Sequence, residues 1–337
     1  MKDFEMELLG LLEEGPKSVW ELLDSVHFLT RDFIDSLNRL YEKGLVESEN
    51  GKVILTCKGR LALGEKPLNV KTKLCECEGR CIAVDGEFKR ILEKYKKAIK
   101  AKPKEKAEYL QGFVKEEDMI SRVAMMDYYG DVAGKEIALI GDWDLGITLG
   151  LTDLPAKILV LDIDERLGEF IRKVNEENGL QIGFMKYDVS DPLPKKLVGK
   201  FDVFSTQPLE SSTALKAFLS RGVSLLKEDG VGYFGLSTSE VPLKRWLEVE
   251  RMMVGMNCAV TDLMRDFITY KSLQDDEDEK VIAKNLSFKT EPNPGIDWYK
   301  SSLFRFQIIG KPNPLVKWDE KTDVESLSEE DLLNPKF

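Results

Sequence analysis

Five short apolar segments between residues 136 and 237 constrain the fold of this chain more than any other feature of its sequence. Each has the length of a buried strand, and most are rich in aliphatic and aromatic residues. Helical segments such as "DERLGEFIRKVNEENG" and "SSTALKAFLSRGVSLLKEDG" lie between them. Strands that alternate with helices pair in parallel, with right-handed crossovers. The sequence therefore predicts an α/β, Rossmann-like, doubly wound sheet. Its predicted strands are 136–140, 157–163, 182–188, 201–207 and 230–237.

The first 64 residues follow a different pattern. Three helical segments precede two short strands around Asn50-Gly51, a dipeptide typical of hairpin turns. This order predicts a winged-helix domain over residues 1–64. Nucleic-acid binding is not expected, because Asp32 and Asp35 lie early in the third helix and the segment carries 8 Lys/Arg against 12 Asp/Glu. We expect a dimerisation or scaffold role instead, and hence a homodimer.

The composition disfavours several classes of function. A formal net charge of −11 argues against a protein that neutralises the phosphates of a nucleic acid. No apolar run reaches the roughly 18 residues of a membrane span, and the acidic start does not resemble a signal peptide. We therefore expect no membrane partner and a cytoplasmic location. The chain has one histidine, His27, so proton transfer falls mainly to carboxylates. A charged fraction of 32% is typical of thermophilic proteins.

Two further segments flank the predicted sheet domain, which we place at residues 131–310. Residues 65–130 form a connector with helices and three cysteines, which a fourth cysteine near the hairpin could join in a structural zinc site. The spacing is irregular for zinc, and the alternative is a set of reduced, partly buried thiols. Residues 311–337 are acidic with little periodicity, which predicts a flexible C-terminal tail, either mobile or draped over the domain. The four cysteines are Cys57, Cys75, Cys77 and Cys81.

The turn after the first predicted strand, "GDWDL", lies where a doubly wound sheet binds its ligand. Gly141 allows the close approach of a ligand to the backbone. The other glycines of a dinucleotide fingerprint are missing, and Asp142 and Asp144 would repel a pyrophosphate. The turn therefore disfavours NAD and ATP.

Acidic residues also end the second and third predicted strands. Asp162 lies 21 residues after Gly141, a spacing typical of an acid that accepts hydrogen bonds from ribose hydroxyls. We assign the adjacent Ile163 to the same site, and Asp188 to the adenine amino group. Gly141 and Asp142 complete a site that suits an adenosine without phosphates. The alternative for Asp188 is that it caps the following segment.

The fourth predicted strand ends in "STQPLES", at the position that faces the reacting centre in adenosyl-dependent transferases. Gln207 can donate and accept hydrogen bonds there, and we place it with the donor-binding residues. An amide cannot act as a base at neutral pH. Glu210, one turn further on, is the candidate catalytic carboxylate; the alternative is an ordinary acid in the first turn of a helix.

These motifs resemble those of the branched-chain polyamine synthases, the N4-bis(aminopropyl)spermidine synthase family of archaea and thermophilic bacteria. The resemblance covers most of the chain and includes "YLQGFVKEEDMISRVAMMDYYGDVAGKEI", "VLDIDERLGEFI" and "DWYKSSLFRFQ". It implies an S-adenosylmethionine-dependent transferase fold. It also implies transfer of an aminopropyl group from decarboxylated S-adenosylmethionine to an amine of spermidine, with release of methylthioadenosine. The family's two turns read Gly-Asp-Asp-Asp and Asp-Pro-Pro-Glu, so Trp143, Gln207 and Leu209 depart from the pattern.

Aminopropyl transfer is a displacement at a carbon beside a sulfonium, so the enzyme mainly positions the reactants and provides a neutral amine. A carboxylate can take the proton of that amine, and other acids can hold its ammonium groups. Asp144 and Glu210 are the candidate catalytic residues and also candidate anchors of the amine substrate. Trp143 either binds an ammonium through its ring or packs under the turn. We also expect Trp298 to line the amine site, where Trp298 and Tyr299 could form an aromatic wall; the alternative is that both belong to the core.

Two other functions stay open at this point. One is an S-adenosylmethionine-dependent methyltransferase, which needs a partner for the methionine carboxylate. The "GDWDL" turn has no Arg or Lys near it in sequence, which favours the decarboxylated donor. The other is a catalytically silent paralogue that binds a polyamine or a nucleoside, because Gln207 is not a base.

Overall fold

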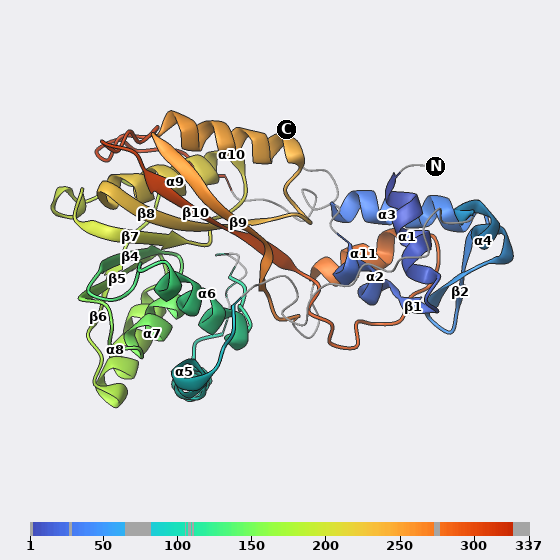
Figure 1. Cartoon of the computed structure of the whole chain (residues 1–337), viewed down its shortest axis with the longest axis horizontal. Coiled ribbons are helices and arrows are strands. Elements are labelled where there is room, and N and C mark those ends of the chain that lie inside the picture. Colours follow the sequence, from blue (N-terminus) through green and yellow to red (C-terminus); the bar gives the residue numbers. More distant parts are fainter. Residues whose placement is uncertain are drawn as a thin grey trace.

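The computed structural model describes residues 3–26, 29–64, 82–104, 106, 109, 111–272 and 277–325, and it folds into a small N-terminal part and a larger sheet-containing part (Figure 1). Among these residues, no helix is both long enough and apolar enough to cross a membrane. The single histidine, His27, lies outside the described residues.

The N-terminal part contains three helices and a hairpin in the predicted order. Asn50 and Gly51 both have positive φ angles, of 50° and 75°, as a tight hairpin turn requires. A short strand before the second helix adds to the hairpin and gives a sheet of order β1-β3-β2. The winged-helix assignment itself stays a prediction. The elements are α1 (Asp3–Leu12), β1 (Lys17–Ser18), α2 (Val19–Ser25), α3 (Thr30–Glu42), β2 (Val46–Glu49), β3 (Lys52–Leu55) and α4 (Cys57–Leu63).

A segment from near the other end of the chain completes the N-terminal core. Helix α11 (Glu277–Asn285) lies among the N-terminal helices, where Ile282 and Leu286 are buried against their apolar side chains (Figure 1). The indole N–H of Trp20 donates to the carbonyl of Glu291 at 2.9 Å. Residues 277–298, which the predicted division assigns to the sheet domain (131–310), therefore pack against the N-terminal part (1–64). The division itself stays a prediction.

The larger part is a seven-stranded sheet of order β6-β5-β4-β7-β8-β10-β9, which confirms the α/β doubly wound fold. Strands β4 to β8 are parallel, and β9 and β10 run antiparallel to their neighbours. The strands are β4 (Glu136–Ile140), β5 (Lys157–Asp162), β6 (Ile182–Lys186), β7 (Phe201–Thr206), β8 (Leu226–Ser237), β9 (Cys258–Thr269) and β10 (Lys300–Ile308).

Helices cover both faces of this sheet, so the parallel strands are buried on both sides. Helices α6, α7 and α8 pack on one face, and α9 and α10 pack on the other (Figure 1). The chain order reverses between β4 and β7, and in such sheets this switch point forms the ligand crevice. The helices are α5 (Gly86–Ala98), α6 (Glu116–Tyr128), α7 (Trp143–Gly150), α8 (Glu165–Asn178), α9 (Ser212–Leu225) and α10 (Leu243–Gly255).

The described part of the C-terminal tail is bound to the sheet domain. The guanidinium of Arg221, fully buried on α9, donates to the carbonyls of Lys317 and Glu320 at 2.7 and 2.5 Å. The prediction of a flexible tail is therefore wrong for residues 311–325, while residues 326–337 lie outside the described residues. Val316 is buried, and Trp318 and Val324 pack against the core of the sheet domain, so apolar side chains without regular spacing also hold the segment.

Candidate functional site

Gly141 forms the turn between β4 and α7 at the switch point. Its φ angle is 62°, a conformation that side-chain-bearing residues rarely adopt, and its N–H donates to the carbonyl of Leu161 at 3.0 Å. The turn thus connects the ends of β4 and β5. This places Gly141 where the sequence predicts close approach of a ligand to the backbone.

Asp142 is engaged in a fully buried ion pair. The Arg122 guanidinium on α6 donates to both carboxylate oxygens, at 2.9 and 2.5 Å, and the Ser205 hydroxyl donates at 2.7 Å. Both charged side chains are 1% exposed. The expectation that no cation lies near the turn is therefore wrong. Asp142 is the local counter-ion of Arg122.

A sequence signal for Arg122 was present. The sequence "MISRVAMM" around Arg122 is largely apolar, and every residue from 118 to 126 of α6 is buried. An arginine within such a helix must find a buried anion, because an isolated buried charge is costly. The sequence does not say which acid that is, since the partner follows the next strand.

Asp144, two residues further on, is also buried and its carboxylate accepts a hydrogen bond from the N–H of Leu145 at 3.0 Å. Burial raises the pKa of Asp144 to about 6, and the charge of Asp142 adds to this effect. The cations of Arg122 and Lys102 act in the opposite direction. Asp142 and Asp144 therefore form a pair of acids whose negative charge is offset by two cations of the protein, Arg122 and Lys102.

Trp143 packs in the core beneath the turn. Its ring lies edge-on to Phe170, with centroids 5.8 Å apart and an interplanar angle of 82°, and the residue is 8% exposed. Of the two interpretations of Trp143, packing under the turn is favoured over binding of an ammonium by an exposed ring.

Trp143→Ala is expected to lower the free energy of unfolding by about 3–5 kcal/mol, because it removes a large buried ring. The apparent KM for the amine substrate should change less than about twofold, since the indole contributes packing and no ion pair. Chemical denaturation and steady-state assays would measure the two effects. A large rise in KM with unchanged stability would instead make Trp143 part of the amine site.

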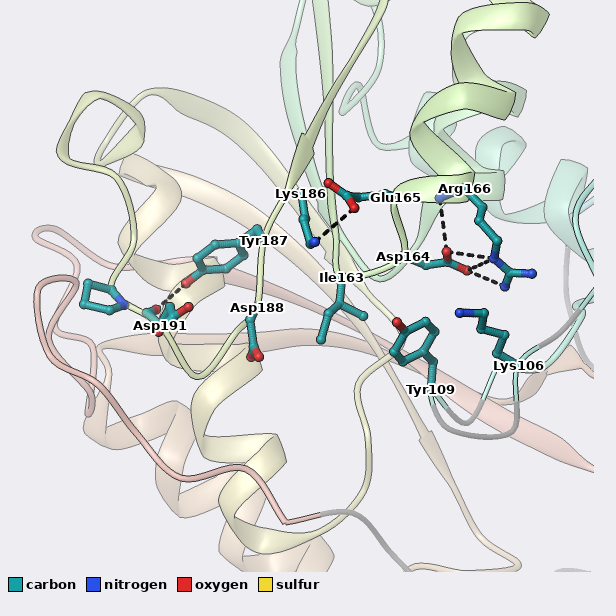
Figure 2. Close-up of a pocket in the computed structure, with 11 residues that line it drawn as sticks. Lys106, Tyr109, Ile163, Asp164, Glu165, Arg166, Lys186, Tyr187, Asp188 and Asp191 are labelled. Carbon is teal, nitrogen blue, oxygen red and sulfur yellow. Dashed lines mark hydrogen bonds and ion pairs between the residues drawn. The ribbon is translucent and has the colours of Figure 1, made fainter.

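Three of the residues predicted for the adenosyl donor, Asp162, Ile163 and Asp188, lie at the ends of β5 and β6. Ile163 and Asp188 line one cavity of about 680 Å³, and Figure 2 shows Ile163 between Asp188 and Tyr109. Ile163 is 38% exposed, although it follows a buried strand. Such an exposed apolar side chain at a strand end suits contact with a flat base. Tyr109, from the connector, was not predicted from the sequence.

The acids at these strand ends differ in their surroundings. Asp162 directly precedes Ile163 and is 8% exposed, and burial raises its pKa to about 6. One of its oxygens accepts the N–H of Asp164 at 2.9 Å. Asp188 accepts the N–H and the hydroxyl of Ser190, at 2.9 and 2.7 Å, through one oxygen. One oxygen of Asp188 thus holds the turn that follows β6, its second oxygen is not used in these bonds, and its assignment to the adenine amino group stays a prediction.

Glu210 lies just after β7, on the other side of the switch point. Its carboxylate accepts the N–H and the hydroxyl of Ser237 from the end of β8, at 2.5 and 2.6 Å. Burial raises the pKa of Glu210 to about 7, while the two hydrogen bonds lower it. The side chain is therefore poised to exchange a proton near neutral pH.

Two tyrosines adjoin Glu210. The rings of Tyr270 and Tyr299 lie edge to face, with centroids 5.3 Å apart, and burial together with the charge of Glu210 raises the pKa of each hydroxyl. The Tyr299 hydroxyl donates to Glu240 at 3.1 Å. Both phenols stay protonated at neutral pH and form an aromatic wall, of which the sequence predicted Tyr299 but not Tyr270.

Gln207 lies between Tyr270 and Gly235 of β8. Its side-chain oxygen accepts the Tyr270 hydroxyl at 2.9 Å, and a Cβ added at Gly235 would stand 2.0 Å from that oxygen. Gly235 therefore makes room for the amide. The Nε2 atom of Gln207 is buried and finds no hydrogen-bond partner among the described residues.

Trp298 lies elsewhere. It is 6% exposed in the N-terminal core, and its indole N–H donates to Glu279 at 3.2 Å. The aromatic wall beside Glu210 is formed by Tyr270 and Tyr299 instead. Trp298 therefore follows the alternative of a core residue, while its neighbour Tyr299 points to the other side of the chain and lines the wall.

The zinc interpretation has no support from the described residues. Cys57 is an exposed free thiol at the start of α4. The other three cysteines of the candidate site lie outside the described residues. Within the described ranges, no group of three or more histidine, cysteine or acidic side chains could hold a metal ion.

Comparison with known proteins identifies the family to which this chain belongs. The branched-chain polyamine synthase A C-terminal domain matches residues 90–333. The chain belongs to the branched-chain polyamine synthase family. It is 35% identical over 297 residues to the N(4)-bis(aminopropyl)spermidine synthase of Thermococcus kodakarensis, covering 86% of this chain and 84% of that protein. It is 37% identical to the protein of the same name from Methanocaldococcus jannaschii, covering 86% and 83%.

A solved member of the branched-chain polyamine synthase family has the same fold over nearly the whole chain. The synthase from Thermus thermophilus, in complex with N4-aminopropylspermidine and 5'-methylthioadenosine, superposes with a TM-score of 0.81 at 27% identity. The match covers 97% of this chain and 92% of that one. The relatives are polyamine synthases, which are transferases, as the sequence motifs predict.

Proposed function

We propose that this protein transfers an aminopropyl group from decarboxylated S-adenosylmethionine to an amine of a polyamine and releases methylthioadenosine. Membership of the branched-chain polyamine synthase family is the observation that carries this proposal, since a solved relative holds methylthioadenosine and a branched polyamine. The cavity beside Ile163 and Asp188 is the proposed position of the adenosine, with Asp162 as the acceptor of the ribose hydroxyls.

The reacting centre is proposed to lie between Gly141 and Glu210. In the reaction the amine lone pair forms a new N–C bond to the aminopropyl carbon next to sulfur, and the C–S bond breaks with its electron pair on sulfur. The positive sulfonium becomes neutral methylthioadenosine, and the amine nitrogen gives up one proton. Glu210 is the proposed base, because its pKa of about 7 allows a carboxylate and a carboxyl form near neutrality.

From the sequence, the decarboxylated donor is preferred over S-adenosylmethionine because no Arg or Lys lies near the turn. We prefer the same donor here for a different reason. The buried cation beside the turn, Arg122, directs both terminal nitrogens at Asp142 and Ser205. A methionine carboxylate would have to compete with Asp142 for that guanidinium. A donor that carries only an amine at this end avoids the competition.

The test is to incubate the protein with decarboxylated S-adenosylmethionine or S-adenosylmethionine and a panel of polyamines. Methylthioadenosine together with a mass gain of one aminopropyl group is the expected result. S-adenosylhomocysteine would make the protein a methyltransferase. Polyamine or nucleoside binding without either product would make it a silent paralogue. The homodimer, the absence of nucleic-acid partners and the cytoplasmic location stay predictions from the sequence.

A further inference from the structure

The first turn of α3 bonds to a loop of the sheet domain. The N–H and the hydroxyl of Thr30 both donate to the carbonyl of Ser239, at 2.8 and 3.2 Å, and Thr30 is fully buried. The N–H groups at the start of a helix have no partner within the helix, and the residue before Thr30 provides no side-chain cap. The carbonyl of Ser239 therefore caps α3 from outside the N-terminal part.

The same loop supports the candidate base. Strand β8 ends at Ser237, whose N–H and hydroxyl donate to the Glu210 carboxylate at 2.5 and 2.6 Å. The N–H of Glu240 donates to the hydroxyl oxygen of Ser237 at 3.4 Å, which leaves the hydroxyl hydrogen for Glu210. Residues 237–240, which we call the β8 loop, thus connect α3 to Glu210.

A second contact fixes the N-terminal part beside the β8 loop. The ammonium of Lys300, at the start of β10, lies 2.6 Å from the carboxylate of Asp24 and donates to the Asp24 carbonyl at 3.2 Å. The next residue, Ser301, pairs with Ser237 in the sheet. Asp24 belongs to α2, so two helices of the N-terminal part contact the strand ends that carry the β8 loop.

The orientation of Ser237 matters because Glu210 is buried. Burial raises the pKa of Glu210 and the two bonds from Ser237 lower it, so these bonds favour the ionised form that accepts a proton. They also direct the carboxylate, and a base must lie within hydrogen-bond reach of the proton that it takes. The charged and titratable groups around Glu210 include the guanidinium of Arg245, which donates to the Glu210 carbonyl at 3.2 Å, the carboxylate of Glu240, and the phenols of Tyr270 and Tyr299.

We propose that the N-terminal part positions the Glu210 carboxylate for proton transfer. Thr30 holds the carbonyl of Ser239, which keeps the β8 loop in place. Ser237 can then donate both of its bonds to Glu210. Thr30 acts through the loop and is a positioning residue. This inference rests on the proposed role of Glu210 as the base and gives the N-terminal part a role in catalysis.

The experiment uses Thr30→Pro. Proline is favoured at the first position of a helix, and the preceding residue has φ −58° and ψ 139°, a conformation that suits a following proline, so α3 should form. The variant lacks both donors to Ser239, and its ring occupies the direction of the lost N–H. We expect kcat for methylthioadenosine formation to fall about tenfold at neutral pH, with KM for the donor changed less than about twofold.

The pH profile of kcat distinguishes positioning from a merely structural contact. In the wild type, kcat should rise with pH through about 7, the pKa of Glu210. In Thr30→Pro this rise should move to higher pH by about one unit, because weaker bonds from Ser237 disfavour the ionised carboxylate.

Thr30→Ser keeps both donors and should have the kcat and the pH profile of the wild type. Thr56→Val is the matched control. The hydroxyl of Thr56 caps α4 and donates to the carbonyls of Gly44 and Leu45, at 2.8 and 3.0 Å, within the N-terminal part. Thr56→Val should lower the thermal midpoint and leave kcat and the pH profile unchanged.

A folded Thr30→Pro variant with the kcat and pH profile of the wild type would overturn the inference. So would a lower kcat with an unmoved pH profile. If Thr30→Pro does not fold, Thr30→Val removes the hydroxyl bond alone and should move the profile by a smaller amount in the same direction. An unmoved profile in Thr30→Val would then overturn the inference.

A titration of isotope-labelled glutamate carboxyls by NMR separates this inference from the proposed function. Glu210→Gln identifies the Glu210 signal by its loss. If no amine yields methylthioadenosine, the proposed function fails. The titration still decides the inference: a higher midpoint for Glu210 in Thr30→Pro than in the wild type supports it, and equal midpoints overturn it.

Discussion

Glu210→Gln is expected to lower the rate of methylthioadenosine formation by about 10²–10⁴-fold, the usual contribution of a general base. Glutamine has nearly the same shape and can still bond to Ser237, so the fold should be retained. Single-turnover assays would measure the loss. Glu228→Gln makes the same change at an exposed position near the start of β8 and should be as active as the wild type. Full activity of Glu210→Gln would show that another group takes the proton.

The pH dependence of the reaction rate is a second test of the role of Glu210. The pKa of Glu210 is raised to about 7, so the carboxylate that accepts the proton predominates above pH 7 and is lost as the pH falls. The rate of the wild type should therefore rise with pH through about 7. In Glu210→Gln this limb should be absent from the residual activity. A profile unchanged by the substitution would contradict the assignment.

Arg122→Met is expected to lower the free energy of unfolding by about 3–5 kcal/mol, because it leaves the carboxylate of Asp142 buried and without its cation. Methionine preserves most of the apolar stem within the crowded α6 helix. Denaturant unfolding and the thermal midpoint would measure the effect. Lys is not an adequate replacement, since it cannot donate to both carboxylate oxygens in the same plane.

The double variant Arg122→Met/Asp142→Asn separates the ion pair from simple loss of packing. Removing both charges should recover a large part of the stability lost in Arg122→Met, because no unpaired charge is left in the interior. A double variant as unstable as the sum of the two single variants would mean that the pair is not coupled. The stability of the turn would then depend on packing alone.

The strand ends could be located from the sequence because they depend on local patterns. Apolar runs of strand length, with helices between them, predicted β4 to β8, and parallel pairing brings their carboxyl ends to one edge. The sequence therefore places Gly141, Asp162 and Glu210 at one edge of the sheet. The resemblance of the motifs to the polyamine synthases agreed with the family found by comparison.

The electrostatic state of these residues was decided by the tertiary structure. Arg122 reaches Asp142 from a helix 20 residues earlier, and Lys102 acts on Asp144 from the connector. The pKa of a carboxylate depends on burial and on every charge within several ångströms, whatever its distance in sequence. A linear pattern contains no information of that kind.

The sequence by itself determined the parallel strands β4 to β8, the helices between them and the edge of the sheet at which polar side chains gather. Only the tertiary structure decided which acids stay available to a substrate. It neutralised Asp142 with Arg122, placed Lys102 near Asp144, gave Glu210 neutral partners and buried Trp298 in the other core. The physical reason is that secondary structure follows from near neighbours in the chain, whereas charge balance and burial follow from neighbours in space.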